Sequence, residues 1–491
     1  MQRTGLRKKA ISGMMWSGLG QFGSYALRYV VFLILAWMLP PAVIGLESLT
    51  TVVFVLAQEV GSLGFDAALI QREDPSREYL DTSFWATLGF SFVSLGFVFL
   101  FAENIALFLG DARAAPLLKA LSLIFPVRVL RVVPNSLLLK DLAFRKLTSI
   151  QFFEQLSFGL VAIFLAVLGA GVWSLVIGRM VMVIVRASIM WSMVSWRPTF
   201  SFRFSAFVDL VKFGSYSLAS NILTRGLVRV DYFLIGRLIG TEGLGYYTLA
   251  SQLAIIPAQR VVGAVQKVVY PTFSHLKSEL ERVKKGFMET LEHLFLIHLP
   301  LSLFLLTLSP LIIELIYGDK WSPAVPLIQI LSLTSVLTAF DINRAVFYTT
   351  GTPRSWMMVI GARILFFVLF TLGLGIQFQL SGVAASFVLA LFATTLGSIY
   401  LVSKIINMTA GELTRCFWIP FRGVIFALIP FLISLAIPVE NIAPWFRLVS
   451  LITTMGGIYL ISIFPAYRDS LQLFLSTMYD FIQRMLEAKS Y

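Results

Sequence analysis

Long apolar runs are the feature of this sequence that most constrains its fold. A helix needs about 20 apolar residues to cross the hydrocarbon core of a bilayer, and such runs follow one another along the whole chain. The runs are continuous and do not alternate with polar residues, which argues against a transmembrane β-barrel. Of the 491 residues, 58% are hydrophobic and only 13% are charged. The sequence therefore predicts an all-α membrane protein.

About 14 transmembrane helices are predicted on this length rule. They lie near 12–38, 42–64, 80–102, 115–137, 148–170, 172–195, 207–239, 242–270, 290–316, 324–350, 356–378, 382–403, 416–438 and 444–465. Four of the connections are very short, namely Leu39–Pro41, Gly169–Gly171, Gly240–Gly243 and Gln379–Gly382. The helices on either side of each should form tight hairpins.

An internal repeat is indicated by Val30–Leu49, which aligns without a gap with Val230–Leu249. Identical residues meet at Val30, Gly45 and Leu49. We interpret the chain as two parallel six-helix lobes around a central cavity, related by an axis along the membrane normal, with two further helices at the C-terminus. The predicted parts are an N-lobe at 1–195, a cytoplasmic inter-lobe loop at 196–206, a C-lobe at 207–403, the appended helices at 404–467 and a cytoplasmic amphipathic helix at 468–491.

The net charge of +13 comes mainly from lysine and arginine in the loops. Cytoplasmic loops of membrane proteins are enriched in these residues, and by this rule both termini of the multi-pass chain should be cytoplasmic. Because the basic residues are scattered among apolar spans, binding of nucleic acid is not expected. The N-terminal run up to Met38 is too long for a signal-peptide core, so it should be an uncleaved first span.

Arginines inside the predicted spans are the strongest functional signal. They are Arg28, Arg225, Arg229, Arg260, Arg344 and Arg363. Arg225 and Arg229 are four residues apart, so on a helix they share one face, and that face should look into a cavity instead of lipid. Because guanidinium groups bind phosphate in a bidentate manner, these residues are predicted to form a cationic substrate-binding cavity for an anion. Alternatively, some extend to the membrane surface, or Arg344 pairs with Asp341 and Arg229 with Asp231.

Acidic residues also lie inside the spans. The candidates are Glu47, Glu59, Asp231 and Asp341. They could be counter-ions of the arginines, which is the interpretation we favour, or they could couple transport to protons or sodium. The three histidines have no metal-ligand spacing, so neither a metal site nor another cofactor is expected. Walker A, GxSxG and HExxH motifs are absent from the sequence, which predicts that the chain is not an enzyme.

Two segments show the helical periodicity of an amphipathic surface helix. In the first, Leu276, Leu280, Val283 and Phe287 share one face. In the second, apolar residues recur between Leu471 and Met485. Both segments are predicted to lie on the cytoplasmic surface of the membrane.

Three motifs carry a resemblance to a known family. They are GFDAALIQREDPSREYLDTSFWAT at Gly64–Thr87, GVWSLVIGRM at Gly171–Met180 followed by SWRPTFSFRFS, and VDYFLIGRLIGTEGLGYYTLASQLA from Val230. Together they resemble the bacterial Wzx-type polysaccharide flippases, in the subgroup of the colanic-acid and teichuronic-acid exporters. That group belongs to the multidrug/oligosaccharidyl-lipid/polysaccharide exporter superfamily. The resemblance covers about residues 5–410.

The resemblance implies a flippase of the bacterial inner membrane. It would translocate an undecaprenyl-pyrophosphate-linked oligosaccharide, the repeat unit of a surface polysaccharide, by alternating access. Polysaccharide polymerase or assembly proteins would be its partners, together with the phospholipid bilayer. Related flippases carry cavity arginines on the first helix of each lobe, which the resemblance carries over to Arg28, Arg225 and Arg229.

Other functions stay open at this point. A cation-coupled multidrug exporter of the same superfamily should have an acidic cavity, whereas the predicted cavity is basic. A membrane-embedded glycan polymerase or ligase would need a substantial outward-facing loop, which the sequence does not offer. A scaffold without transport activity would leave the arginines inside the spans unexplained.

Overall fold

The structure is a computed structural model that describes residues 23–72, 75–221, 229–277, 279–436 and 443–487, and every regular element in these ranges is helical. The described chain divides into two compact units, which are treated separately below. Unit 1 contains the residues up to Leu249 together with Ile316–Trp321. Unit 2 contains Ala250–Leu315 and the residues from Ser322 onward.

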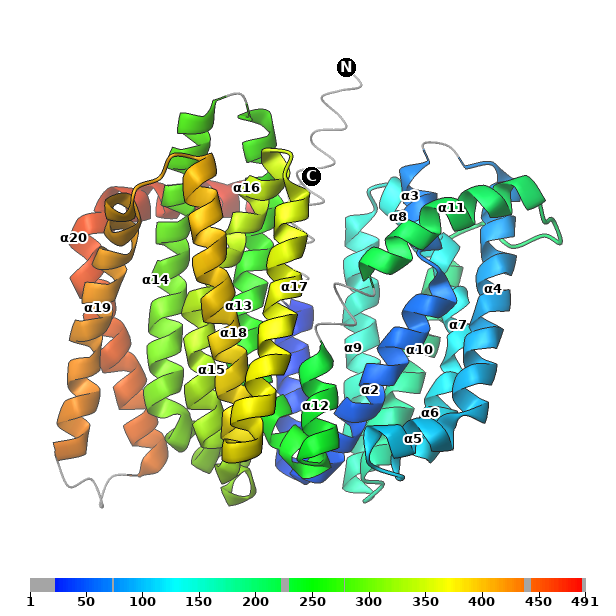
Figure 1. Cartoon of the computed structure of the whole chain (residues 1–491), viewed down its shortest axis with the longest axis horizontal. Coiled ribbons are helices and arrows are strands. Elements are labelled where there is room, and N and C mark those ends of the chain that lie inside the picture. The colour runs from blue at the N-terminus through cyan, green and yellow to red at the C-terminus, as the bar shows by residue number, and fades with distance from the viewer. Residues whose placement is uncertain (1–22, 73–74, 222–228, 278, 437–442, 488–491) are drawn as a thin grey trace. The chain divides into compact units, whose positions relative to one another are not determined.

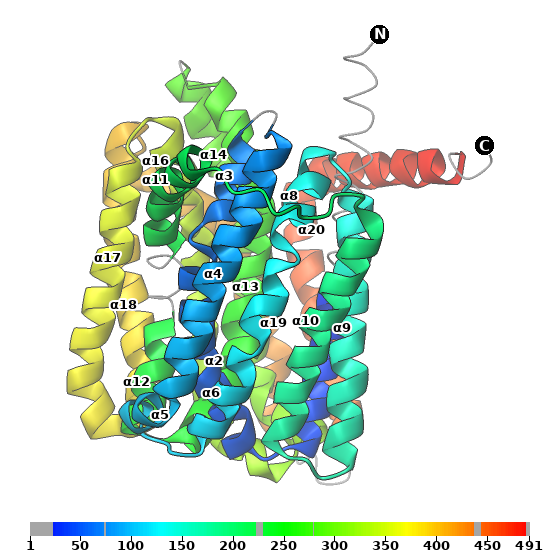
Figure 2. The ribbon, with the colours of Figure 1, turned by 90° about the vertical axis from the view of Figure 1, so that its right-hand side faces the viewer.

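Unit 1 is built on long helices that run side by side (Figure 1). Its elements are the helix Gly23–Met38, α2 (Pro41–Ser62), α3 (Phe65–Gln71), α4 (Arg77–Leu100), α5 (Ala102–Leu109), α6 (Ala114–Ser122), α7 (Ile124–Val129), α8 (Val132–Lys140), α9 (Phe144–Val167), α10 (Val172–Met193), α11 (Phe204–Asn221), α12 (Val230–Leu238) and the start of α13 (Thr241–His275). α9 and α10 form a hairpin that is visible in both views (Figure 1, Figure 2). Its turn depends on Gly169 and Gly171, whose φ values of +78° and +56° favour glycine.

The two segments that align in the sequence meet within unit 1. A Cβ atom added to Gly45 would lie 1.7 Å from the Thr241 carbonyl oxygen, and one added to Gly245 would lie 2.0 Å from the Pro41 carbonyl oxygen. The two helices can therefore approach this closely only because both positions are glycine. We call this contact the glycine crossing. One turn further along, the Thr248 hydroxyl donates to Ser48 Oγ at 3.1 Å.

Residues 316–321 also pack into unit 1, although they are distant in sequence. Trp321 is fully buried and donates its indole N–H to the Ala36 carbonyl at 2.8 Å. Its ring also meets Tyr246 edge to face, with 5.9 Å between the centroids. This segment therefore connects the helix Gly23–Met38 with the start of α13.

Unit 2 is also entirely helical in the part that the structure describes. After the rest of α13 it contains α14 (Leu280–Ile312), α15 (Val325–Thr338), η5 (Ala339–Ile342), α16 (Asn343–Thr349), α17 (Pro353–Phe370), η6 (Thr371–Gly375), α18 (Ile376–Ile405), α19 (Ala410–Ala436) and α20 (Pro444–Glu487). The short helices η3 (Ile313–Tyr317) and η4 (Asp319–Ala324) are divided between the two units, because Ile316–Trp321 belong to unit 1. α14 packs against α15 and α19, and α17 packs against α18. In Figure 2 the last part of α20 runs across the direction of the other long helices of its unit.

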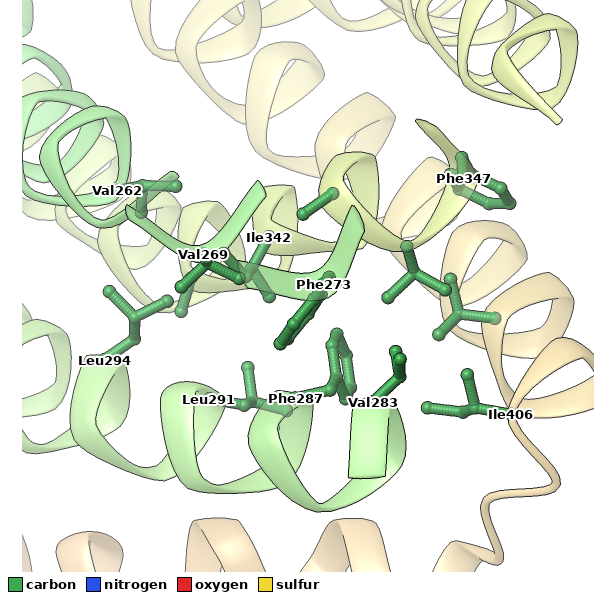
Figure 3. Close-up of a cluster of buried hydrophobic side chains, with 14 of the residues drawn as sticks. Val262, Val269, Phe273, Val283, Phe287, Leu291, Leu294, Ile342, Phe347 and Ile406 are labelled. Atoms are coloured by element: carbon green, nitrogen blue, oxygen red, sulfur yellow. The ribbon is translucent and has the colours of Figure 1, made fainter. Parts of the chain in front are cut away.

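The core of unit 2 corrects one prediction. α14 begins at Leu280, and its first turns carry Val283 and Phe287, which are both buried against Phe273 of α13 (Figure 3). This apolar face therefore packs inside the protein, and the prediction that it lies on the membrane surface was wrong. The helical period was read correctly, but periodicity alone does not identify what covers an apolar face.

The predicted spans agree with the structure in most places. Among the described residues, nine helices are long and apolar enough to cross a membrane, and Gly23–Met38 is a shorter apolar helix. One of the nine, Pro353–Ile405, contains two predicted spans, because the backbone at Gln379 leaves the helical region (φ 48°, ψ −126°) at the predicted turn. The span predicted at 115–137 is instead three short helices, α6, α7 and α8. The count of fourteen stays a prediction.

The predicted lobe boundary at 196–206 differs from the division of the structure. α11 packs against α3 and α4, and α12 packs against α2, so both helices lie in unit 1. The structure therefore divides after Leu249, well beyond the inter-lobe loop that the sequence suggests. Whether the lobes move as 1–195 and 207–403 stays a prediction.

Candidate functional site

A polar cavity of about 250 Å³ lies inside unit 1. The end of α2, the start of α3, the middle of α4 and the break between α7 and α8 form its walls. Two arginines, Arg128 and Arg131, line the cavity together with Glu59 and Asp66. Four ionisable side chains therefore face one small space within a helical bundle, where an ionised group is costly unless it is compensated.

Local geometry places the two arginines. α7 ends at Val129 and α8 begins at Val132, so Arg128 lies in the last turn of one short helix and Arg131 is the N-cap of the next. The Arg128 guanidinium lies 5.7 Å from the ring centroid of Phe54, within cation–π range. Phe54 stacks in turn on Phe125, with 5.4 Å between the centroids. The helix break therefore directs cationic side chains toward an aromatic wall.

Two ion pairs connect α10 with its neighbours in unit 1. Arg179 of α10 pairs with Glu47 of α2, and Arg186 of α10 pairs with Glu154 of α9 at 2.7 Å. The side chains of all four residues are at most 22% exposed. Pairing and partial burial make Glu47 a counter-ion of an arginine, which is the role that we favoured for the acidic residues.

Arg229 and Asp231, which were predicted from the sequence, lie at the start of α12. The Arg229 guanidinium stacks 4.4 Å from the ring centroid of Tyr232. The buried Asp231 carboxylate accepts hydrogen bonds from the Tyr247 hydroxyl at 3.0 Å and from the Tyr232 backbone N–H at 2.9 Å. Both groups are therefore held mainly by tyrosines of α12 and α13.

In unit 2, Asp341 pairs with Arg363 at 3.1 Å, and both side chains are 22% exposed. Arg363 also donates to Thr394 Oγ1 at 3.3 Å. Arg344, the partner that the sequence suggested for Asp341, is exposed and stacks 5.2 Å from the ring centroid of Tyr348. The structure thus pairs Asp341 with Arg363 of α17, which is distant in the sequence, instead of with Arg344 at the start of α16.

The remaining predicted residues have different environments. Arg28 is exposed on the helix Gly23–Met38, and Arg260 is exposed on α13. Glu59 lines the cavity of unit 1. Arg225 lies outside the described residues. Within the described ranges, no group of three or more His, Cys, Asp or Glu side chains could hold a metal ion.

Four buried or half-buried arginines were missed by the sequence analysis, namely Arg128, Arg131, Arg179 and Arg186. The signal was available, since all four lie inside predicted spans, at 115–137 and 172–195. The predicted arginines lie in the first, seventh, eighth, tenth and eleventh spans, whereas these four lie in the fourth and sixth. A complete count of cations within spans would have found them.

Comparison with known proteins decides the family. The model of the family described as "Polysaccharide biosynthesis protein" matches residues 34–326, which is more than half of the chain. The chain belongs to this family. The resemblance that was drawn from the motifs is therefore confirmed.

The chain is also similar to several named bacterial proteins. The chain is 29% identical to the teichuronic acid biosynthesis protein TuaB of Bacillus subtilis over 68% of this chain and 69% of that protein. It is 29% identical to the succinoglycan biosynthesis transport protein ExoT of Rhizobium meliloti, over 65% of each chain. It is 25% identical to the lipopolysaccharide biosynthesis protein WzxC of Escherichia coli, over 85% of each chain.

Solved structures share the fold of this family member. The lipid II flippase MurJ, in an inward closed conformation, superposes with a TM-score of 0.75 at 15% identity, over 93% of this chain and 100% of that chain. An inward-facing multidrug resistance transporter of the MATE family superposes with a TM-score of 0.61 at 15% identity, over 78% of this chain and 94% of that chain. The predicted all-helical transporter fold is therefore confirmed. The prediction that the chain is a transport protein and not an enzyme agrees with this family and this fold.

Proposed function

We propose that this protein is a flippase that translocates a lipid-linked oligosaccharide, the repeat unit of a surface polysaccharide, across the bacterial inner membrane. The observation that carries the proposal is the set of arginines buried or half-buried inside the helical bundle of a chain that belongs to a polysaccharide biosynthesis family. The carrier would be undecaprenyl pyrophosphate. Both termini would be cytoplasmic, and polysaccharide polymerase or assembly proteins would receive the product.

The physical argument concerns the head of such a substrate. A diphosphate loses most of its hydration when it enters a bundle within the bilayer, and arginines restore the lost interactions through charge-assisted hydrogen bonds. Arg229 is suited to this role because the ring of Tyr232 holds its guanidinium in place, and a guanidinium has five N–H donors, more than one partner uses. We include Arg28, Arg225, Arg260 and Arg344 in the proposed cationic set, whereas Arg363 already has a carboxylate partner.

The acidic residues have different environments, which bears on coupling. Glu47 and Asp341 are each paired with an arginine and act as counter-ions. Among the described residues, the hydrogen bonds to the Asp231 carboxylate come from a tyrosine hydroxyl and a backbone N–H. If proton or sodium coupling occurs, we propose Asp231 as its site, because a buried carboxylate held by neutral donors can change its protonation or its ligand at lower cost than one in an ion pair.

Complementation tests the proposal. A strain that lacks the gene is supplied with the wild-type chain, with Arg229→Gln, or with Arg237→Gln, an exposed arginine of the same helix that serves as the matched control. Surface polysaccharide and lipid-linked oligosaccharide in the inner leaflet are measured. Arg229→Gln should lower the amount of surface polysaccharide and raise the amount of lipid-linked oligosaccharide in the inner leaflet, at an unchanged level of the protein. Arg237→Gln should match the wild type in both measurements.

The same strains separate the rival function. A multidrug exporter would change the sensitivity of the strain to cationic drugs and leave surface polysaccharide unchanged. That result would overturn the proposal. Full export with Arg229→Gln at unchanged drug sensitivity would instead remove Arg229 from the substrate site.

A further inference from the structure

The cavity of unit 1 contains arginines whose donors are not used by protein carboxylates. Among the described residues, no carboxylate lies within the 4.0 Å of an ion pair from Arg128 or Arg131, whereas Arg179 and Arg186 of the same unit are both paired. A guanidinium carries five N–H donors and stays ionised in proteins. The carboxylates of Asp66 and Glu154 attract both arginines from beyond ion-pair distance, which leaves the N–H donors available to a ligand. The cavity therefore calls for a ligand with several acceptor oxygens.

The position of Arg131 strengthens this requirement. It occupies the N-cap of α8, where Ser, Thr, Asp or Asn are preferred, and no side chain caps this helix end. The first turn of α8 contains no acidic residue. Because a helix N-terminus carries partial positive charge, Arg131 adds charge of the same sign to it. Both effects favour an anionic group in the adjoining cavity, which Arg131 and Val132 line.

Two hydroxyl groups of the lining can accept hydrogen bonds from a ligand. The Thr87 and Ser91 hydroxyls donate to carbonyl oxygens of their own helix, at 2.7 Å each, so their lone pairs remain for a ligand. The lining also includes the carboxylates of Glu59 and Asp66. A simple phosphate has few protons to offer such acceptors, whereas a sugar has several hydroxyls. The mixed lining therefore matches a group that is anionic at one end and rich in hydroxyls at the other.

Size limits the ligand further. Pockets for whole small-molecule ligands usually measure about 300–1,000 Å³, and this cavity measures about 250 Å³. It is too small for an oligosaccharide but suits one sugar residue with its phosphate. The aromatic ring of Phe125 forms part of its wall and offers an apolar surface for a sugar ring.

We propose that this cavity binds a glycosyl phosphate, namely the junction at which the first sugar of the substrate is attached to its phosphate. Arg128 and Arg131 would hold the phosphate oxygens, while Glu59, Asp66 and Thr87 would accept hydrogen bonds from sugar hydroxyls. The inference rests on the proposed function, since the lipid-linked oligosaccharide supplies the glycosyl phosphate. It adds a site within unit 1 for one defined part of that substrate.

Binding to the purified full-length chain in lipid nanodiscs tests this site. Calorimetry with glucose 1-phosphate, glucose, inorganic phosphate and glycerol 3-phosphate compares the wild type with Arg128→Gln and Arg131→Gln. Arg77→Gln, an exposed arginine at the start of α4, is the matched control. Glucose 1-phosphate should bind best, and each cavity variant should weaken it by about tenfold, the loss of one charge-assisted hydrogen bond, while Arg77→Gln should not.

Several outcomes would overturn the inference. Equal binding of inorganic phosphate would indicate a simple anion site, and equal binding of glycerol 3-phosphate would indicate a phospholipid headgroup. Unchanged affinity in both arginine variants would also contradict the site. If those variants fail to fold, Thr87→Val removes one acceptor while keeping the shape of the side chain, and it should weaken glucose 1-phosphate without affecting phosphate.

The assay is independent of the proposed function. If glucose 1-phosphate does not bind while the wild-type chain restores surface polysaccharide, the site fails and the flippase stands. If it binds to the cavity while deletion of the gene leaves surface polysaccharide intact, the flippase fails and the site remains.

Discussion

A single methyl group added at the glycine crossing, the contact of Gly45 and Gly245 with the starts of each other's helices, should strongly destabilise unit 1. In Gly45→Ala the new carbon would lie 1.7 Å from the Thr241 oxygen, half of the 3.4 Å at which ordinary contact begins. The two helices must therefore separate by about the same distance. That separation would break the Thr248–Ser48 hydrogen bond, which now measures 3.1 Å.

The expected cost follows from these two effects. Overpacking of this kind costs about 1–3 kcal/mol, and the lost hydrogen bond adds about 1 kcal/mol. Gly45→Ala should therefore cost about 2–4 kcal/mol, and Gly245→Ala, whose carbon would lie 2.0 Å from the Pro41 oxygen, should behave alike. Gly89→Ala in α4 is the matched control, since nothing lies within 4 Å of its added carbon.

Thermal unfolding in detergent, followed by tryptophan fluorescence, measures the effect. Gly45→Ala and Gly245→Ala should lower the unfolding temperature, while Gly89→Ala should keep it or raise it slightly because alanine favours a helix over glycine. If Gly45→Ala unfolds at the same temperature as Gly89→Ala, the close approach of the two helices is wrong.

Three further predictions concern contacts within one unit. Arg363→Met should lower the free energy of unfolding by about 1–3 kcal/mol, because it leaves the Asp341 carboxylate half-buried without its partner. The double variant with Asp341→Asn should recover part of this loss, whereas strictly additive effects of the two substitutions would exclude the pair. Trp321→Phe should lower the free energy of unfolding by about 1–3 kcal/mol, because a fully buried side chain loses volume and its hydrogen bond to the backbone. An unchanged unfolding temperature would show that residues 316–321 are not packed into unit 1 as described. Hydrogen bonds from Arg113 hold the pKa of the Asp111 carboxyl below its usual value, against the opposing effect of partial burial. This pair therefore stabilises the protein fully above about pH 3.9, and the stabilisation is lost as the pH falls through the lowered pKa. Asp111→Asn should lower the free energy of unfolding by about 0.2–1 kcal/mol at pH 7 and by progressively less as the pH falls below about 3.9; an effect that does not change with pH would refute the assignment.

The hairpins of this fold could be predicted because their turns are marked in the sequence. The turns with Gly169 and Gly171, and the break at Gln379, lie where short polar or glycine-containing connections interrupt the apolar runs. The repeat register was also informative, since Gly45 and Gly245 turn out to face the starts of each other's helices. Length, apolar character and turn residues are local properties, so a single sequence reveals them.

The partners of charged groups could not be predicted in the same way. Asp341 pairs with Arg363 of a neighbouring helix and not with the adjacent Arg344, because the choice depends on how helices pack in three dimensions. The segment at 276–287 was assigned to the membrane surface, although Val283 and Phe287 are buried. Its apolar face has the same period whether lipid or protein covers it.

The presence of the cavity arginines could be predicted from the sequence, but their position at one cavity could not. Arg128 and Arg131 are visible in the sequence as cations within an apolar run. Their meeting at one cavity depends on the break of the predicted span 115–137 into α6, α7 and α8, which no proline or glycine at 130–131 announces. The cause lies four residues further on, at Pro134, which has no N–H to donate to the Leu130 carbonyl. That carbonyl instead accepts the indole N–H of Trp191 at 2.6 Å.

Translocation in a purified system tests the central claim most directly. The full-length chain is reconstituted in liposomes that carry a fluorescent undecaprenyl-pyrophosphate-linked monosaccharide, and an impermeant quencher added outside reports the leaflet that the probe occupies. The flippase account predicts that probe from the inner leaflet becomes accessible to quencher with the wild-type chain and more slowly with Arg229→Gln. Equal rates in protein-containing and protein-free liposomes would contradict it.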